Sequence, residues 1–170
     1  MFREKISKEL MGSLVKQRDD KKLAITKENN EKSQFLNNLR EKMEQKVYSR
    51  EFQTQLFKAL EDNLKYAKEV ENIDQVIIKV SAYLCDTERL VIEFKTSHTT
   101  IDSCGCFPNF IQFNDDDYVA MVDAGTKFLE GALKEFGFVG VHTLESDFSG
   151  EWDGTYHFYE SRVAGTIPMN

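Results

Sequence analysis

The segment DYVAMVDAGTKFLEGALKEF, residues 117–136, decides the fold of this chain. Its apolar residues recur at steps of three and four, which places them on one side of an α-helix. These residues are Tyr118, Met121, Val122, Gly125, Phe128, Leu129, Ala132, Leu133 and Phe136. The opposite side is polar and includes Asp123, Thr126 and Lys127. Because Gly125 and Ala132 are small, the pattern predicts a helix that lies close against a flat partner.

Both ends of this segment carry helix-boundary signals. Residues 114–117, Asn-Asp-Asp-Asp, offer side-chain oxygens to the free backbone amides of a helix start, where negative charge is also favourable. Gly137 directly follows the last apolar residue, at the position where a left-handed backbone conformation commonly ends a helix. The helix is therefore expected to begin near residue 115 and to end near residue 136.

Segments with a period of two lie on both sides of the helix and supply the flat partner. Residues 73–85 and 90–95 alternate apolar and polar side chains around a short Asp-Thr-Glu connection, which predicts a β-hairpin. Residues 138–145 and 155–163 alternate in the same way. We expect residues 96–114 to be irregular, with a short strand at residues 110–113, and the tail after Ala164 to be frayed.

The order of elements is thus β-β-α-β-β, preceded by a helical region. A helix that covers one face of an antiparallel sheet defines an α+β domain. The change of period near residue 73 predicts two parts, a charged helical region at residues 1–72 and an α+β domain at residues 73–170. Residues 146–154, rich in Gly, Ser and Asp, read as a turn between the last two strands.

The helical region has an apolar seam whose role the sequence leaves open. Leu36, Leu39, Met43 and Val47 follow a 3-4-4 spacing, which is typical of a packed helical face. The seam either packs on the chain's own α+β domain or joins a partner as a coiled coil. Ser49 could cap a further helix, so residues 31–71 form one helix or two. The polar stretch at residues 18–30 reads either as a loop or as a solvated part of a long helix.

The net charge of −7 hides a division along the chain. Residues 1–50 contain 13 Lys/Arg and 8 Asp/Glu, a balance of +5, whereas residues 51–170 contain 9 and 21, a balance of −12. The acidic part predicts poor general binding of nucleic acid, because phosphates need a basic surface. Only residues 1–50 could bind nucleic acid, an acidic partner, or the acidic part of another copy.

The composition also indicates in which cellular compartment this protein is expected. The charged start MFREK predicts no signal peptide, and apolar runs are too short to cross a bilayer, so we expect no membrane contact. The three cysteines are an odd set that suits a reducing compartment. We expect a cytoplasmic protein, including the cytoplasm of an infected host cell or an assembled particle.

The strongest candidate for chemistry is a thiol and imidazole cluster. His98, Cys104 and Cys106, joined by His142 or His157, have the ligand types that zinc prefers, and a thiol beside an imidazole base could act as a nucleophile. The spacing argues against zinc, because structural zinc sites present Cys pairs two to four residues apart, and nothing in the sequence places His98 within reach of a thiol. We therefore interpret these thiols as ordinary side chains and predict no metal and no cofactor.

Two further groups of residues have simpler interpretations. The carboxylates at residues 115–117 serve a helix start, and Asp147, Glu151 and Asp153 lie in the expected turn. Trp152 and Tyr159 belong to an aromatic stretch with few basic residues, which favours a protein contact over base stacking.

These observations lead to one functional hypothesis and two alternatives. The hypothesis is a non-enzymatic interaction or assembly protein, such as a virion component, an inhibitor or an immunity-type protein. Its partner-binding residues would be Leu36, Leu39, Met43, Val47, Trp152 and Tyr159, with self-association through residues 31–71. The alternatives are a small metal- or thiol-dependent hydrolase that uses His98, Cys104 and Cys106, and nucleic-acid binding through residues 1–50.

Overall fold

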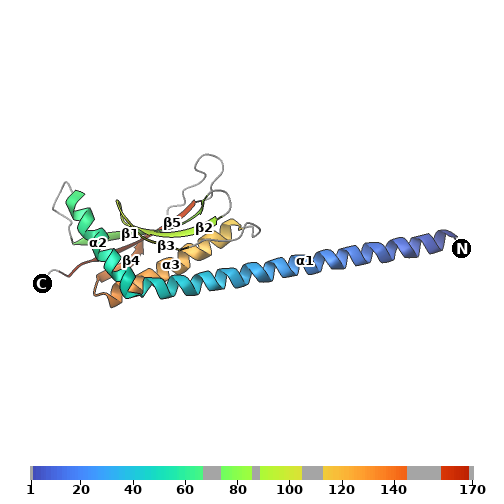
Figure 1. Ribbon diagram of the computed structural model, residues 1–170, viewed down its shortest axis with the longest axis horizontal. Helices are drawn as coiled ribbons and strands as arrows, with labels where there is room; N and C mark the ends of the chain where they lie inside the picture. The colour runs from blue at the N-terminus through green and yellow to red at the C-terminus, as the bar shows by residue number, and fades with distance from the viewer. Residues whose placement is uncertain (1, 67–73, 86–88, 105–112, 145–157, 169–170) are drawn as a thin grey trace. The chain divides into compact units, whose positions relative to one another are not determined.

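The computed structural model describes residues 2–66, 74–85, 89–104, 113–144 and 158–168 (Figure 1). The chain divides into two compact units, Met1–Asn37 and Asn38–Asn170. The first unit consists of most of helix α1, which runs from Phe2 to Val47. The second unit holds the end of α1 and all other elements. The boundary expected between residues 72 and 73 lies outside the described residues.

The second unit is built on a five-stranded antiparallel sheet in the order β3-β2-β1-β5-β4 (Figure 1). The strands are β1 Gln75–Cys85, β2 Arg89–Lys95, β3 Thr100–Cys104, β4 Val139–Leu144 and β5 Phe158–Thr166. The long strand β1 lies in the middle, paired with β2 on one side and with β5 on the other. The predicted hairpin, the two later strands and the α+β class are confirmed.

Helix α3, Asp115–Glu135, is the predicted central helix. The Asn114 side chain accepts a hydrogen bond from the Asp117 amide at 3.0 Å, and the Asp117 carboxylate accepts one from the Asn114 amide at 2.8 Å. This reciprocal capping box satisfies two amides at the helix start. At the other end Gly137 has a φ of 95°, the left-handed conformation that glycine adopts without strain.

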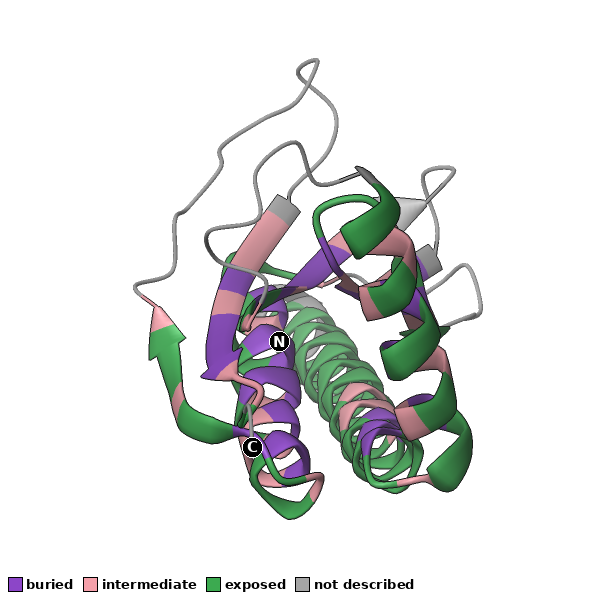
Figure 2. Cartoon of the chain, turned by 90° about the vertical axis from the view of Figure 1, so that its left-hand side faces the viewer, coloured by how far each residue is buried: buried purple, intermediate pink, exposed green. Residues whose placement is uncertain are grey.

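The core lies between one face of the sheet and three helical segments. Every second residue of β1, Val76 to Ala82, is buried, and so are Ile92 and Phe94 of β2. Figure 2 shows buried segments both in the sheet and in the helices that pack on it. Helix α3 covers this face across β1, β5 and β4. Helix α2, Arg50–Tyr66, adds Phe52, whose ring meets that of Phe94 edge-on with centroids 5.4 Å apart. The period of two along β1 and β2 therefore sorts their apolar side chains onto this one face.

At Gly125 helix α3 lies close to the sheet. A Cβ at this position would lie 3.0 Å from Val80 Cγ1, 3.6 Å from the Phe94 ring and 3.7 Å from the Met43 sulfur. These three side chains come from β1, β2 and α1, and a Cβ at residue 125 would press on Val80 while making ordinary contacts with the other two. The prediction that Gly125 allows close packing is confirmed.

Residues 31–66 form two helices, which answers a question that the sequence left open. Helix α1 ends at Val47, and the Ser49 hydroxyl accepts a hydrogen bond from the Phe52 amide at 3.1 Å, so Ser49 caps α2 as predicted. Near this junction the Lys46 ammonium donates to the Asp102 carboxylate at 3.1 Å and to the Ser103 carbonyl at 3.2 Å. These bonds join the last turn of α1 to the edge strand β3.

Three details differ from the sequence predictions. Residues 96–114 were expected to be irregular, but Thr100–Cys104 form β3, because pairing with β2 at the sheet edge outweighs a weak local pattern. Thr126 was placed on the polar side of α3 but is buried. The tail does not fray after Ala164, since β5 reaches Thr166 and the Ile167 amide donates to the Asp74 carbonyl at 2.8 Å. The short strand expected at residues 110–113 and the turn at 146–154 fall on undescribed residues, except Phe113, which is not in a strand.

Candidate interaction surface

The most unusual surface of this protein is the N-terminal unit, a single helix. Every residue from 7 to 31 is exposed, including the stretch at 18–30 that the sequence left as either loop or helix. Lys and Glu favour helix, and Lys27 and Glu31 form an i,i+4 pair with charged atoms 3.9 Å apart. Local propensity therefore supports the helix, but it buries little apolar surface.

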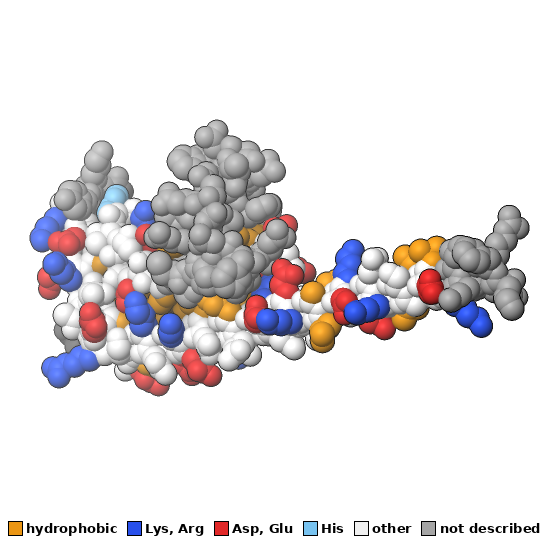
Figure 3. All heavy atoms as spheres, turned by 45° about the vertical axis from the view of Figure 1, so that its right-hand side comes forward, with side chains coloured by type: hydrophobic (Ala, Val, Ile, Leu, Met, Phe, Trp, Pro, Cys, Tyr) orange, Lys and Arg blue, Asp and Glu red, His pale blue; other side chains and the backbone are white. Residues whose placement is uncertain are grey.

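Apolar side chains nevertheless gather on one side of this exposed helix. A helix turns by about 100° per residue, so positions spaced by three, four and seven share a side. We call the following set the front face: Ser7, Leu10, Met11, Leu14, Val15, Arg18, Lys21, Lys22, Ile25, Glu28, Asn29 and Lys32. Its five apolar side chains are each between 42% and 59% exposed. Figure 3 shows apolar and charged side chains next to one another along this helix.

The charges of the helix are divided unequally between its two sides. Within residues 7–32 the front face has four basic residues, Arg18, Lys21, Lys22 and Lys32, and one acidic residue, Glu28, a net charge of +3. The remaining residues, which we call the back face, have three basic and four acidic residues, a net charge of −1. Arg18 forms an exposed ion pair with Asp19 at 3.1 Å. The apolar side of the helix is therefore also its basic side.

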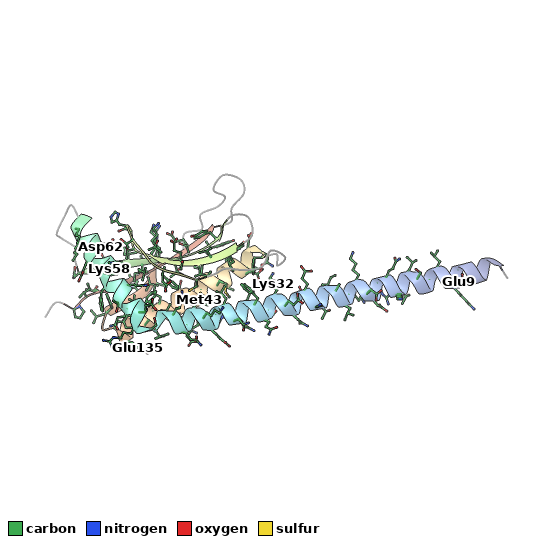
Figure 4. All side chains as sticks on the ribbon, in the orientation of Figure 1. Glu9, Lys32, Met43, Lys58, Asp62 and Glu135 are labelled. Atoms are coloured by element: carbon green, nitrogen blue, oxygen red, sulfur yellow. The ribbon has the colours of Figure 1, made fainter. Side chains whose placement is uncertain are left out.

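The predicted partner-binding seam lies mostly in the interior of the second unit. Leu39, Met43 and Val47 are buried, whereas Leu36 is half-buried. Figure 4 places Met43 on the part of α1 that lies beside α3. In the single chain the last turns of α1 thus serve the chain's own core.

Of the two aromatic candidates, the structure describes only Tyr159. Trp152 lies outside the described residues. Tyr159 on β5 is half-buried, and its ring stacks on that of Tyr118 from α3 with centroids 5.9 Å apart. Burial raises the pKa of Tyr159, and the nearby Asp115 and Asp116 raise it further. Tyr159 therefore contributes its ring to the contact between α3 and the sheet.

The thiol and imidazole candidates are distributed over the sheet. Cys104 lies on β3 and His142 on β4, which are the two opposite edges. His98 is exposed in the connection before β3, and His142 is exposed with its Nδ1 2.7 Å from the Gly140 carbonyl oxygen. Cys106 and His157 lie outside the described residues. Within the described ranges no three His, Cys, Asp or Glu side chains are arranged to hold a metal ion.

Cys104 has the properties of an interior thiol. Burial raises its pKa to about 11, and the positive charge of Lys46 only partly opposes this effect. At neutral pH the group is therefore protonated, and a protonated thiol is a poor nucleophile.

This leads to a chemical prediction for Cys104. In the native protein at pH 7.5, iodoacetamide is expected to leave Cys104 unmodified under conditions that fully modify it in urea, with peptide mass spectrometry as the measurement. Because the folded-state pKa exceeds that of the unfolded chain, the stability contributed by this group is complete below about pH 9 and is lost as the pH rises toward 11. Equal modification rates in the native and unfolded protein would contradict the burial of this thiol.

The fold and the surface together define a class: an α+β unit joined to an exposed helix whose apolar side is basic. No protein-family model, no curated protein and no solved structure matches the chain. Among the described helices, none is long and apolar enough to cross a membrane.

Sequence reasoning missed the front face for an identifiable reason. In the sequence, Phe2, Ile6, Leu10, Leu14 and Val15 fit only one short amphipathic helix, and the seam at residues 36–47 has the more regular apolar spacing. The distribution of charge around the helix was the signal that could have found it. That signal requires residues 18–32 to be helical, which the sequence left undecided.

Proposed function

We propose that this protein is a non-enzymatic interaction or assembly protein, in which the front face of α1 is the contact surface. The observation behind the proposal is the exposure of Leu10, Met11, Leu14 and Val15 within two turns of one helix. Contiguous exposed apolar surface on a folded chain is typical of protein contacts.

The energetics of the helix support this proposal. Most helices in proteins are stabilised by packing of an apolar face rather than by propensity alone. Covering each half-exposed apolar side chain of the front face would contribute roughly 1 kcal/mol. A partner that covers Leu10, Leu14 and Ile25 would therefore stabilise both the helix and the complex.

The proposal moves the contact surface away from the seam at residues 36–47. Leu39 and Met43 are already buried by their own unit, so association through residues 31–71 would compete with the core. The front face has no such competing role in the exposed stretch at residues 7–31.

A capture experiment with matched variants tests the proposed function. The full-length protein is immobilised and exposed to lysate of the cells that produce it, beside the variant Leu10→Asp/Leu14→Asp and the control Leu23→Asp. Leu23 lies on the back face and is 70% exposed, so its substitution adds a charge to the same helix without touching the front face.

The front-face variant is expected to lose at least nine-tenths of the protein that the wild type and Leu23→Asp retain, because two buried carboxylates would oppose the contact. Quantitative mass spectrometry of the retained proteins is the measurement, and far-UV circular dichroism checks that the helix persists. Retention of the same proteins in the same amounts by all three chains would disprove the proposed role of the front face.

A further inference from the structure

The charges around the exposed part of α1 indicate what kind of partner it takes. Arg18, Lys21 and Lys22 all lie between the apolar cluster at residues 10–15 and Ile25 on the same side of the helix. Acidic residues are concentrated on the back face. A partner that covers the apolar side chains would therefore bring its own surface against cations, and carboxylates at the rim would be attracted to them.

Two arrangements that pair two copies through this face are unfavourable. A parallel pair in register would place Arg18, Lys21 and Lys22 opposite the same cations of the second helix. An antiparallel pair that aligned Leu14 with Lys22 would instead bury cations against apolar side chains. Like charges that face one another weaken binding, and so do charges that are buried without a partner of opposite sign.

The rest of the chain also argues against nucleic acid as the partner. Residues 38–170 contain 13 Lys/Arg and 23 Asp/Glu, a net charge of −10, which repels a phosphate backbone. The cations of the front face follow the apolar cluster at residues 10–15 and border Ile25, and the face has no aromatic side chain that could stack on bases. Apolar residues with basic neighbours instead suit an apolar groove or seam with an acidic rim.

We infer that the front face of α1 pairs with an acidic amphipathic helix of another protein, one whose apolar seam is flanked by Glu or Asp. This inference rests on the proposed function and adds the chemistry of the partner. In such a pair the partner helix covers Leu10, Leu14 and Ile25, and its carboxylates pair with the cations that lie between and beside them, Arg18, Lys21 and Lys22. The geometry is that of two-stranded helix pairing, in which flanking charges select the partner.

Synthetic helical peptides provide a direct probe of this chemistry. One peptide carries a Leu seam with flanking Glu, and a second carries the same seam with flanking Lys. Binding to the full-length protein is measured by fluorescence anisotropy for the wild type, for Lys21→Glu/Lys22→Glu on the front face, and for Lys16→Glu/Lys27→Glu on the back face. The two variants change the net charge equally, and circular dichroism verifies that both retain the helix.

The wild type is expected to bind the Glu-flanked peptide and not the Lys-flanked one. Front-face reversal is expected to weaken binding about tenfold and back-face reversal less than about twofold, since only the front-face charges meet the carboxylates. Higher salt is expected to weaken the wild-type complex. Equal effects of the two reversals, preference for the Lys-flanked peptide, or no binding to the Glu-flanked peptide would each overturn the inference.

Other occupants give different results in the same assay series. Duplex DNA, or vesicles with anionic lipid, would overturn the inference if either bound the wild type more tightly than the Glu-flanked peptide. Concentration-dependent self-association that is lost in Leu10→Asp/Leu14→Asp would overturn it in favour of a second copy. If the inference fails while Leu10→Asp/Leu14→Asp still abolishes capture from lysate, the proposed function stands and only the acidic chemistry of the partner is wrong.

Discussion

The substitution Phe94→Ala is expected to lower the free energy of unfolding by about 3–5 kcal/mol, as large-to-small changes of buried aromatic residues do. Phe94 lies on the core face of β2 and is completely buried. Its ring contacts Phe52 of α2 edge-on and approaches Gly125 of α3. Removal of the ring would therefore leave a cavity bordered by two helices, neither of which can move in without losing its other contacts.

A urea titration of the full-length protein measures this effect. Near-UV circular dichroism is a suitable signal, because it reports the aromatic contacts of the second unit rather than the helix content of the first. Phe94→Leu keeps most of the apolar volume and is expected to lose less, which preserves a measurable result if Phe94→Ala does not fold. Ile77→Ala is the control, since Ile77 lies on the opposite face of the sheet and is 41% exposed. A loss as large for Ile77→Ala as for Phe94→Ala would contradict the assignment of the core face.

The substitution Met43→Ala is expected to cost about 2–5 kcal/mol, although Met43 lies on the same helix as the exposed front face. Met43 is completely buried in the second unit, and its sulfur lies 3.7 Å from the Cβ position of Gly125. Its side chain fills the space that the absent side chain of Gly125 leaves between α1 and α3. Shortening it to Ala would remove these contacts from both helices.

Met11→Ala is the matched control, because it makes the same chemical change in the same helix at a residue that is 59% exposed. We expect it to change the free energy of unfolding of the second unit, measured by urea titration, by less than about 0.5 kcal/mol. The two substitutions together distinguish a seam that belongs to the core from a seam that binds a partner. If Met43→Ala left stability unchanged, the seam would not belong to the core, and its assignment to a partner would be restored.

Local patterns in the sequence were sufficient for the elements whose signals lie within a few residues of one another. The capping box of α3 joins Asn114 to Asp117, three residues away, and the left-handed Gly137 follows directly on the helix end. The alternation in β1 and β2 is similarly local, and it identified the hairpin. Such signals act through neighbouring backbone groups, so they are visible without the fold.

Strand β3 and the burial of Thr126 were not visible in this way. Thr100–Cys104 becomes a strand because β2 offers it a free edge, and its local pattern is no stronger than that of an irregular segment. Thr126 occupies a polar position of the α3 pattern but is buried in the folded unit. Neither fact can be read from a window of neighbouring residues.

The sequence by itself determined the amphipathic helix at residues 115–135, the hairpin, the later strands and hence the α+β class. Only the tertiary structure decided that Met43 is a core residue while Met11 is exposed, although both lie on apolar sides of one helix. The physical reason is that periodicity specifies which side chains share a side of a helix, whereas burial depends on what lies opposite. For Met43 the opposite surface is formed by Val80, Phe94 and Gly125, residues that only the folded sheet and α3 bring together.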